Sequence, residues 1–528
     1  MKELLTSSQR RVLIVLFILA LIVFGYSLNF DFVLDDENQI LNNERIHSLW
    51  SIPDAFTGST MDALGAKKLG GIYYKPIMTC SYILLWAISG TSFPFHVFQL
   101  ILHVFNAFLI QRFFLTFDQF KKNELFALIL ASVYLIHPIN VETVVHIADL
   151  QDVLFTFFGL LALNLMTRSY WSNWTENFLL FGLLELSLLS KESGILSLLI
   201  TGLYCGLFRK KKWPSWLGVA LSVIALYLFL RIGVAELTHG ANSSQMLRAS
   251  LPVRLLSMPK VFAHYIEVFF FPKELTLVQD WVVSEFSARE FFIPLLVVGS
   301  FFSGFVFLAW RSQSPLTWFF LIWLILGMGA HSNLVAIDGS VADRWFYFPF
   351  IGLLGFLAQL WFQYESRFEK IRVHWKTSFV LLLFFLMGGR TFARTLDWES
   401  GMKLYQHDLA LMPDSFYLAN NVGVEYFRMG EIEIARAYFQ RSTELFPQWV
   451  TNWTNLGAAY QRQGKLDQAE LCFERSVKNG ASALGYQNYA NILSILGKKA
   501  ELKEFLEKTA FRYFPENPIL RSIYMKNF

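Results

Sequence analysis

The sequence predicts an all-α protein: a polytopic bundle of membrane helices followed by a C-terminal α-solenoid. The 528 residues are 54% hydrophobic and 17% aromatic but only 16% charged, unlike the composition of soluble domains. Apolar stretches of about twenty residues, long enough to cross a bilayer, recur along the chain. After about residue 395 the composition becomes that of a soluble protein, and a sequence repeat begins.

The composition also excludes several classes of function. A net charge of +4 is small for this length, and no basic stripe is interleaved with aromatic residues, so we expect no nucleic-acid binding. The three cysteines, Cys80, Cys205 and Cys472, are far apart, which indicates neither a disulfide framework nor a cysteine-based zinc site.

We predict about eleven membrane helices from the apolar stretches. They lie near residues 11–29, 95–117, 124–146, 151–168, 177–192, 193–208, 214–232, 291–310, 316–336, 344–364 and 377–393. The first stretch is longer than the apolar core of a usual signal peptide and lacks a small-residue cleavage site, so we interpret it as a retained helix.

Basic clusters at alternate helix ends orient the chain by the positive-inside rule. The clusters are Arg10 and Arg11, Lys121 and Lys122, Arg168, Arg209 to Lys212, Arg311, and 367–376. The N-terminus is then cytoplasmic and the C-terminal part external. Short loops and compact size favour a bacterial inner membrane.

Two shorter apolar segments, 76–89 and 258–271, do not fit this alternation. Both are short, bounded by prolines and rich in aromatic residues, so we expect interfacial or re-entrant helices on the external side. The first external loop then runs from about residue 30 to 94; we call it the first loop. It contains two adjacent carboxylates, Asp35 and Asp36.

The C-terminal region repeats with a period of 34 residues. Gly423, Tyr426, Gly430, Ala435 and Phe439 recur as Gly457, Tyr460, Gly464, Ala469 and Phe473. This spacing is typical of tetratricopeptide repeats, in which small residues let paired helices approach and aromatic residues fill the gaps. We predict a membrane domain over 1–395 and a repeat domain over 396–528, with repeats at about 414–447 and 448–481 and a degenerate one at 482–515.

Charged residues collect at the predicted external helix ends. A charge within or beside a membrane helix is costly unless it is paired or hydrated, so this set indicates a shared hydrated site. The set comprises Asp35, Asp36, Lys75, His137, Glu142, Asp149, Asp152, Lys191, Glu192, Asp343 and Arg344.

Six motifs in order resemble a known family. They are L-D-D-E-N-Q-I-L-N-N (34–43), Y-Y-K-P-I-M-T (73–79), F-H-V-F-Q-L-I-L-H-V-F-N (95–106), H-P-I-N-V-E-T-V (137–144), S-K-E-S (190–193) and D-R-W-F-Y-F-P (343–349). With the repeats, they resemble the transmembrane and tetratricopeptide-repeat glycosyltransferases, which are similar to protein O-mannosyltransferases of the GT-C superfamily. The resemblance covers nearly the whole chain.

The resemblance implies transfer of a mannose-like sugar, with inversion, from a polyprenyl-phosphate donor to a hydroxyl of protein Ser/Thr or a glycan on the external face. A carboxylate would deprotonate the incoming hydroxyl opposite the leaving group. Family likeness assigns this role to the acidic pair: we assign Asp35 as the base and Asp36 to positioning, and the reverse order stays open.

The leaving phosphate requires positive charge or hydrogen-bond donors. Arg344 is our first candidate because guanidinium offers a planar match to phosphate. Lys191 is the second, with an ion pair to Glu192 or Glu185 as the alternative. His137 either donates to phosphate or caps a helix before Pro138. Lys75 completes the donor set, and Glu142, Asp149, Asp152, Glu192, Tyr74 and Tyr347 are predicted to support it.

Two departures from the family pattern affect phosphate binding. The family often has an arginine where this chain has Leu150, and Y-R-P where this chain has Tyr74, Lys75 and Pro76. Lysine lacks the bidentate fork of arginine, so a different sugar or carrier contact could follow.

Metal binding has little support in the sequence. His96 and His103 are seven residues apart, with Gln99 and Asn106 on or near the same face, and hydrogen bonding between helices explains them better than a ligand set. We predict no certain cofactor; a divalent cation on Asp35 and Asp36 is the alternative that stays open.

Two other functions fit the sequence less well than the glycosyltransferase. A lipid-linked glycan polymerase or ligase tends to place its catalytic loop late in the chain, whereas the acidic loop here follows the first helix. A non-catalytic membrane-anchored scaffold needs only one helix and leaves the external charges unexplained. The expected partners are a polyprenyl-phosphate sugar, a protein or glycan acceptor, and the bilayer. The repeats either hold the acceptor or have a purely structural role.

Overall fold

The computed structural model describes residues 6–60, 73–167, 173–237, 245–277, 279–337, 339–368 and 373–528. Arg168, part of the basic cluster at 367–376 and residues 61–72 of the first loop lie outside them. The chain forms two compact units, which we describe separately. Unit 1 comprises Met1–Gly58, Tyr74–Leu237 and Ala249–Glu399, and unit 2 comprises Ser59–Tyr73, Thr238–Arg248 and Ser400–Phe528.

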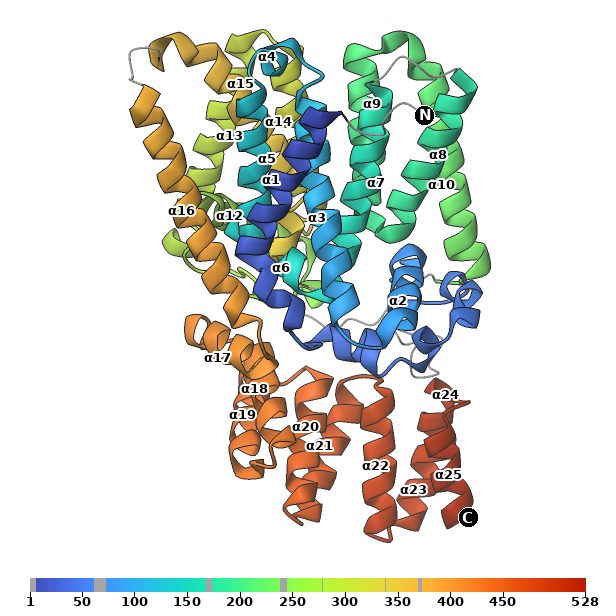
Figure 1. The fold of residues 1–528 in the computed structure, drawn as a ribbon. Helices are drawn as coiled ribbons and strands as arrows, with labels where there is room; N and C mark the ends of the chain where they lie inside the picture. The colour runs from blue at the N-terminus through green and yellow to red at the C-terminus, as the bar shows by residue number, and fades with distance from the viewer. Residues whose placement is uncertain are drawn as a thin grey trace. The chain divides into compact units, whose positions relative to one another are not determined.

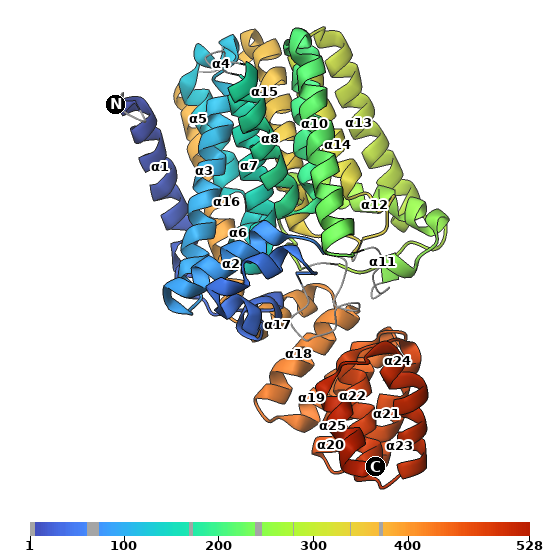
Figure 2. The same cartoon turned by 90° about the vertical axis from the view of Figure 1, so that its right-hand side faces the viewer.

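All eleven predicted apolar stretches form helices in unit 1 (Figure 1). They are α1 (Ser7–Phe24), α3 (Phe93–Phe114), α5 (Glu124–Ile136), α7 (Leu150–Met166), α8 (Asn173–Ser190), α9 (Ile195–Phe208), α10 (Trp213–Leu228), α13 (Ile293–Ser312), α14 (Pro315–Ala330), α15 (Pro349–Phe368) and α16 (Val373–Asp397). The long helices run roughly side by side (Figure 2). The all-α class is confirmed.

Several of these helices can cross a bilayer, which makes the chain a multi-pass membrane protein. Among the described residues, six helices are long and apolar enough, or seven if one bent pair counts as a span. The predicted number of eleven stays a prediction. The bent pair joins α5 to Pro138–Val145 at an angle of 49°. Pro138 explains the break, because proline lacks the N–H that an uninterrupted helix would use there.

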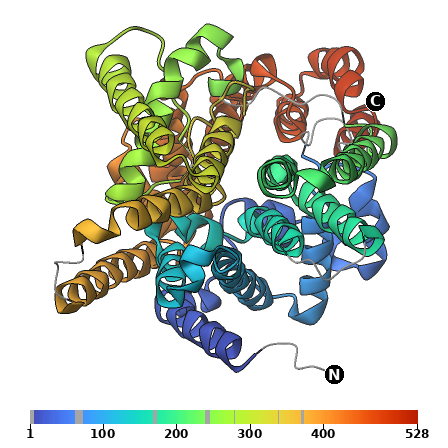
Figure 3. The same cartoon turned by 90° about the horizontal axis from the view of Figure 1, so that it is seen from above.

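Unit 1 packs through close helix contacts. α7 packs against α3, α8 and α9, and α14 packs against α15. A Cβ atom at Gly355 would lie 2.2 Å from the Phe320 ring, so only glycine permits this α14–α15 approach. Figure 3 places α1 at the edge of the unit. Its exposed Ile14, Ile18 and Ile22 fit contact with lipid.

The two shorter apolar segments fold differently. α2 (Pro76–Ser89) has the predicted bounds and ends at Gly90, whose φ of 63° is left-handed. The prediction for 258–271 was too short: α12 (Leu251–Phe270) is a 20-residue helix with Pro259 inside it. Proline at a helix interior removes one backbone hydrogen bond but does not require the helix to end. The interfacial position of both helices stays a prediction.

Unit 2 consists of helix pairs. The helices are α17 (Gly401–Leu411), α18 (Phe416–Arg428), α19 (Ile432–Leu445), α20 (Val450–Arg462), α21 (Leu466–Asn479), α22 (Ala483–Ile495), α23 (Lys499–Phe505) and α25 (Pro518–Asn527). A Cβ atom at Gly423 would lie 2.7 Å from the Phe439 ring, and one at Gly457 would lie 2.6 Å from the Phe473 ring. Glycine at this repeat position therefore lets the aromatic ring of the second helix fill the space.

Replacing Gly457 by valine should destabilise unit 2 by about 1–3 kcal/mol, because the Phe473 ring cannot retreat without shifting its helix. We expect faster proteolysis of the repeat region in the full-length protein and a lower melting temperature. Gly299→Ala is the control, because nothing lies within 4 Å of an added Cβ there. Equal melting of both variants would contradict this account of the repeat packing.

Candidate functional site

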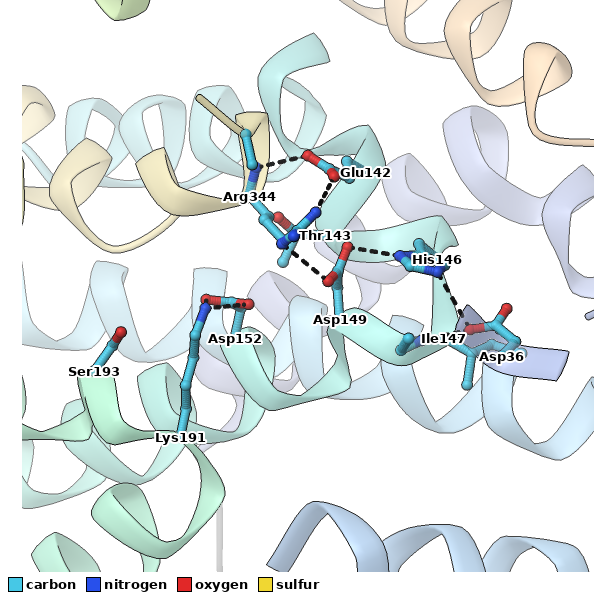
Figure 4. Close-up of polar contacts among 12 residues, drawn as sticks. Asp36, Glu142, Thr143, His146, Ile147, Asp149, Asp152, Lys191, Ser193 and Arg344 are labelled. Carbon is cyan, nitrogen blue, oxygen red and sulfur yellow. Dashed lines mark hydrogen bonds and ion pairs between the residues drawn. The ribbon is translucent and has the colours of Figure 1, made fainter. Parts of the chain in front are cut away.

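Charged side chains from four parts of unit 1 meet in one cluster (Figure 4). The first loop provides Asp36, and the α5–α7 connection with the start of α7 provides Glu142, His146, Asp149 and Asp152. Lys191 lies between α8 and α9, and Arg344 lies in the 3-10 helix before α15, η13 (Asp343–Phe346). The fold therefore brings together charged groups that lie as far apart in the sequence as residues 36 and 344.

Arg344 contacts two carboxylates of the cluster, those of Glu142 and Asp149. Its guanidinium Nη1 donates to Glu142 Oε1, its backbone N–H donates to Glu142 Oε2 at 3.0 Å, and its Nε lies 3.2 Å from Asp149 Oδ1. Among the described residues, Nη2 has no protein partner, and the side chain is 18% exposed. Two of the three guanidinium nitrogens therefore contact carboxylates, and Nη2 is the one left to meet a ligand.

His146 links this arginine cluster to the first loop. Its Nδ1 lies 2.9 Å from Asp149 Oδ2, and its Nε2 lies 3.4 Å from Asp36 Oδ1. Burial alone would lower the pKa of His146, but Asp149 and Asp36, with a smaller contribution from Asp35, raise it to about 9. The imidazole is therefore protonated at neutral pH and lies between two carboxylates.

Asp36 is buried and firmly held. Its Oδ1 accepts a hydrogen bond from the Ala148 backbone at 2.7 Å, and its Oδ2 accepts one from the Val33 backbone at 3.3 Å. Burial raises the pKa of Asp36 to about 6, although His146 and the two backbone donors act in the opposite direction. The charge of His146 and the two backbone donors favour the ionised form of this carboxylate.

Asp35 differs from its neighbour in being exposed. It follows Leu34, whose φ of 56° is unusual for a residue with a side chain. Among the residues that the structure describes, no hydrogen bond or ion pair engages the Asp35 carboxylate. The pair is thus divided into one buried, fully bonded carboxylate and one solvent-accessible carboxylate.

The connection between α5 and α7 positions most of these groups. After Pro138 the chain forms a short helix, α6 (Val141–Val145), and His146 then takes an extended conformation before a 3-10 turn. The amide of Gln99 donates to the carbonyls of Thr143 and His146 at 2.6 and 2.8 Å. The Tyr82 hydroxyl donates to the Ile147 carbonyl at 3.1 Å. Side chains of α3 and α2 therefore satisfy the irregular backbone.

A second group of polar contacts adjoins the first. Lys191 Nζ donates to both oxygens of Asp152 at 2.7 and 2.8 Å. Glu192 Oε1 accepts hydrogen bonds from the Tyr74 backbone at 3.1 Å and from Arg231 at 3.2 Å. These contacts fix the chain that carries Lys75 close to the α8–α9 junction.

Lys75 is buried beside that junction. Burial lowers its pKa to about 8, although the Glu192 carboxylate acts in the opposite direction. Lys191, Asp152 and Arg344 also act on its charge. Lys75 is therefore close to the other cationic candidates, and its proton is more easily lost than that of an ordinary lysine.

Two predicted site residues have their bonds elsewhere. His137 Nδ1 accepts from the Ile139 backbone at 3.2 Å and caps the turn after Pro138, and Nε2 donates to the Phe269 carbonyl at 3.1 Å. The Tyr347 hydroxyl bonds with His103 at 2.8 Å and Asn106 at 3.0 Å.

Lys191 pairs with Asp152 rather than with Glu192 or Glu185.

Sequence reasoning missed His146 and Arg231. His146 and Asp149 are three residues apart in H-I-A-D, a weak signal, and the acidic partner in the first loop lies 110 residues earlier. Arg231 lies inside an apolar stretch predicted as a membrane helix, so the sequence does not mark it as a member of the charged site. The polar residues on α3 do bond between helices, as expected: His103 Nε2 donates to the Leu135 carbonyl at 2.9 Å. Within the described ranges, no three His, Cys, Asp or Glu side chains lie close enough to hold a metal ion.

Sequence comparison adds independent information. A family model described as tetratricopeptide repeat matches residues 417–448 and 450–479. Protein O-mannosyl-transferase F38B6.6 of Caenorhabditis elegans is 23% identical over 444 residues, which are 80% of this chain and 61% of that protein. This chain is similar to the protein O-mannosyl-transferases. The resemblance predicted from the motifs is confirmed.

Further comparisons agree. Protein O-mannosyl-transferase TMTC3 of Mus musculus is 22% identical over 464 residues, 79% of this chain and 49% of that protein. The chain thus spans about half to three fifths of the length of these animal relatives. Among solved structures, ArnT from Cupriavidus metallidurans in the apo state has a TM-score of 0.41 and 16% identity, covering 98% of this chain and 85% of that chain.

The Lys191–Asp152 pair allows a stability test. Asp152→Asn should destabilise unit 1 by about 3–5 kcal/mol, because it leaves a buried ammonium without its counter-charge. Replacing both residues, Asp152→Leu with Lys191→Met, should restore part of the loss. Asp118→Asn is the matched control, since Asp118 pairs with Lys121 at 2.8 Å but is 86% exposed. Melting temperatures in detergent report the result, and equal melting of the two single variants would contradict the prediction.

Proposed function

We propose that this chain is a membrane glycosyltransferase of GT-C type that transfers a mannose-like sugar from a polyprenyl-phosphate donor to a hydroxyl. The similarity to protein O-mannosyl-transferases supports the class of reaction. The observation that carries the proposal is the cluster itself: an exposed carboxylate, Asp35, acts electrostatically on the guanidinium of Arg344, whose Nη2 makes no hydrogen bond to the described residues. The acceptor is a Ser or Thr hydroxyl of a protein, or a glycan hydroxyl.

The division of the acidic pair supports Asp35 as the base. A base must reach the incoming hydroxyl and accept its proton, which requires an accessible oxygen. Asp35 is exposed, whereas Asp36 uses its oxygens on the Ala148 and Val33 amides and on His146. Asp36 then fixes the loop that presents Asp35. The reaction inverts the sugar because the hydroxyl attacks opposite the departing phosphate.

Arg344 is proposed to bind the donor phosphate through Nη2. The carboxylates of Glu142 and Asp149 hold its other nitrogens in place, so the guanidinium is oriented before the donor arrives. Lys191 and Lys75 add positive charge on the side of α8 and α9. Donor binding to this cluster would place the phosphate opposite the acidic pair.

The remaining assignments follow from the predicted topology. We propose that residues 1–395 form the glycosyltransferase domain and 396–528 a repeat domain that holds the acceptor. The N-terminus is cytoplasmic, and the acidic first loop and the repeats lie outside the cytoplasm, on the periplasmic face of a bacterial inner membrane. Polyprenyl-phosphate sugars serve as donors on that side, where nucleotide sugars are not available.

Transfer of label tests the function directly. Membranes with the wild type should move radiolabelled mannose from polyprenyl-phosphate mannose to envelope protein or glycan. Asp35→Asn and Arg344→Ala should reduce the rate by about 10²-fold or more, because each removes a group that acts on the reacting atoms. Other polyprenyl-phosphate sugars are tested in parallel, so that a different donor is detected.

The control for this assay is Asp118→Asn, an exposed carboxylate outside the cluster. Protein levels are matched by immunoblotting. Equal labelling by the wild type and both cluster variants would remove the catalytic assignment. It would favour the alternative of a membrane-anchored scaffold.

Lys75 provides a pH test of the phosphate site. Its pKa of about 8 means that its charge is present below pH 8 and is lost as the pH rises through that value. Donor affinity should therefore weaken between pH 7 and 8.5, seen as a rising KM. Lys75→Arg keeps its charge throughout this range, so its KM should stay constant. Identical profiles for the two proteins would exclude Lys75 from donor binding.

A further inference from the structure

His146 lies between a carboxylate of the first loop and the arginine cluster. The first loop contacts the cluster through Asp36, whose Oδ1 is 3.4 Å from Nε2 of the ring. The cluster begins at Asp149, whose Oδ2 is 2.9 Å from Nδ1, and continues through its Oδ1 to Arg344 at 3.2 Å. Figure 4 shows this path from Asp36 to Glu142.

The geometry favours a charged ring. Nδ1 of His146 is hydrogen-bonded to Asp149 Oδ2 at 2.9 Å, and Nε2 lies 3.4 Å from Asp36 Oδ1 without a hydrogen bond. An ionised carboxylate oxygen accepts hydrogen bonds but donates none. A neutral imidazole that donates through Nδ1 would leave the lone pair of Nε2 near a negatively charged oxygen, whereas an imidazolium makes that contact an ion pair. The two carboxylates are buried, which makes an unpaired charge costly.

The surroundings of the ring support the same reading. The indole of Trp398, which is 1% exposed, lies beside the imidazole with ring centroids 5.4 Å apart and planes inclined by 32°. An aromatic face near a cation stabilises the positive charge. The Gln99 amide donates to the backbone carbonyl of His146 itself, so the backbone holds the ring in this position.

We propose that His146 is a positioning residue: as an imidazolium it ties the acidic pair of the first loop to the Asp149–Arg344 side of the site. Its positive charge keeps Asp36 ionised and in place, and Asp36 in turn fixes the loop that presents Asp35. The proposal rests on the function proposed above. It adds that the base and the phosphate-binding arginine are oriented by one network rather than by two separate ones.

The test is a double-mutant cycle with His146→Gln, Asp36→Asn and the two combined. His146→Gln keeps a polar side chain but cannot carry charge. We expect kcat for sugar transfer to fall at least about tenfold, while KM for polyprenyl-phosphate mannose changes by less than about twofold, because Arg344 keeps its bonds to Glu142. In the Asp36→Asn background, His146→Gln should lower kcat little further, because the two side chains act through one contact with each other.

Melting temperature provides the same cycle where residual activity is too low to measure. His146→Gln should lower the melting temperature of the wild type, because Asp36 and Asp149 lose a buried counter-charge, and should lower that of Asp36→Asn by less. The control is Asp118→Asn, an exposed carboxylate of unit 1 outside the cluster that pairs with Lys121 at 2.8 Å. This control should leave kcat unchanged.

The outcomes separate this proposal from the proposed function. Inactive Asp35→Asn and Arg344→Ala together with a normal kcat in His146→Gln would overturn the role of His146 alone. Additive losses in the double variant would also overturn it, because His146 would then act independently of Asp36. Normal transfer by Asp35→Asn and Arg344→Ala would instead remove the function on which it rests.

Discussion

The ion pairs of Arg344 with Glu142 and Asp149 are the constraint on which the polar end of unit 1 depends. They join segments 202 residues apart in the chain. In a region of low dielectric, removing one member of such a network leaves a buried charge without its partner, which is strongly destabilising. Arg344 therefore fixes the α5–α7 connection, which in turn presents His146 to Asp36 and the Ala148 amide to the same carboxylate.

This arrangement needs an irregular backbone inside an apolar bundle, where unsatisfied N–H and C=O groups are costly. The break at Pro138 creates that irregular segment, and neighbouring helices supply the missing partners. Gln99 on α3 donates to two carbonyls, Tyr82 on α2 donates to a third, and Asn140 donates to the Tyr134 carbonyl at 2.7 Å. The motif H-P-I-N-V-E-T-V thus ends one helix before Pro138 and directs the Glu142 carboxylate toward Arg344.

The sequence predicted the helices well because apolar length determines them: the stretch expected at 95–117 is Phe93–Phe114 in the structure. It predicted the helix over 124–146 less well, because the break at Pro138 depends on partners from other helices. The clustering of charged residues was predictable because an isolated charge beside a membrane helix is costly. Which charged residue pairs with which was not predictable. Nothing local to Lys191 indicates Asp152, and nothing near Asp36 indicates His146, since these contacts exist only after the helices pack.

The pairing also bears on how a phosphate could bind. In the described part of the chain, Arg344, Lys191 and His146 each already face a carboxylate. A donor phosphate that displaced one of these carboxylates from its cation would leave a buried negative charge unpaired. That loss costs several kcal/mol. Binding at Nη2 of Arg344, as proposed above, would avoid that cost, because the guanidinium would contact the phosphate and both carboxylates at once. The carboxylates orient the arginine, so in this proposal the position of Nη2, rather than the total positive charge, sets where a phosphate would bind.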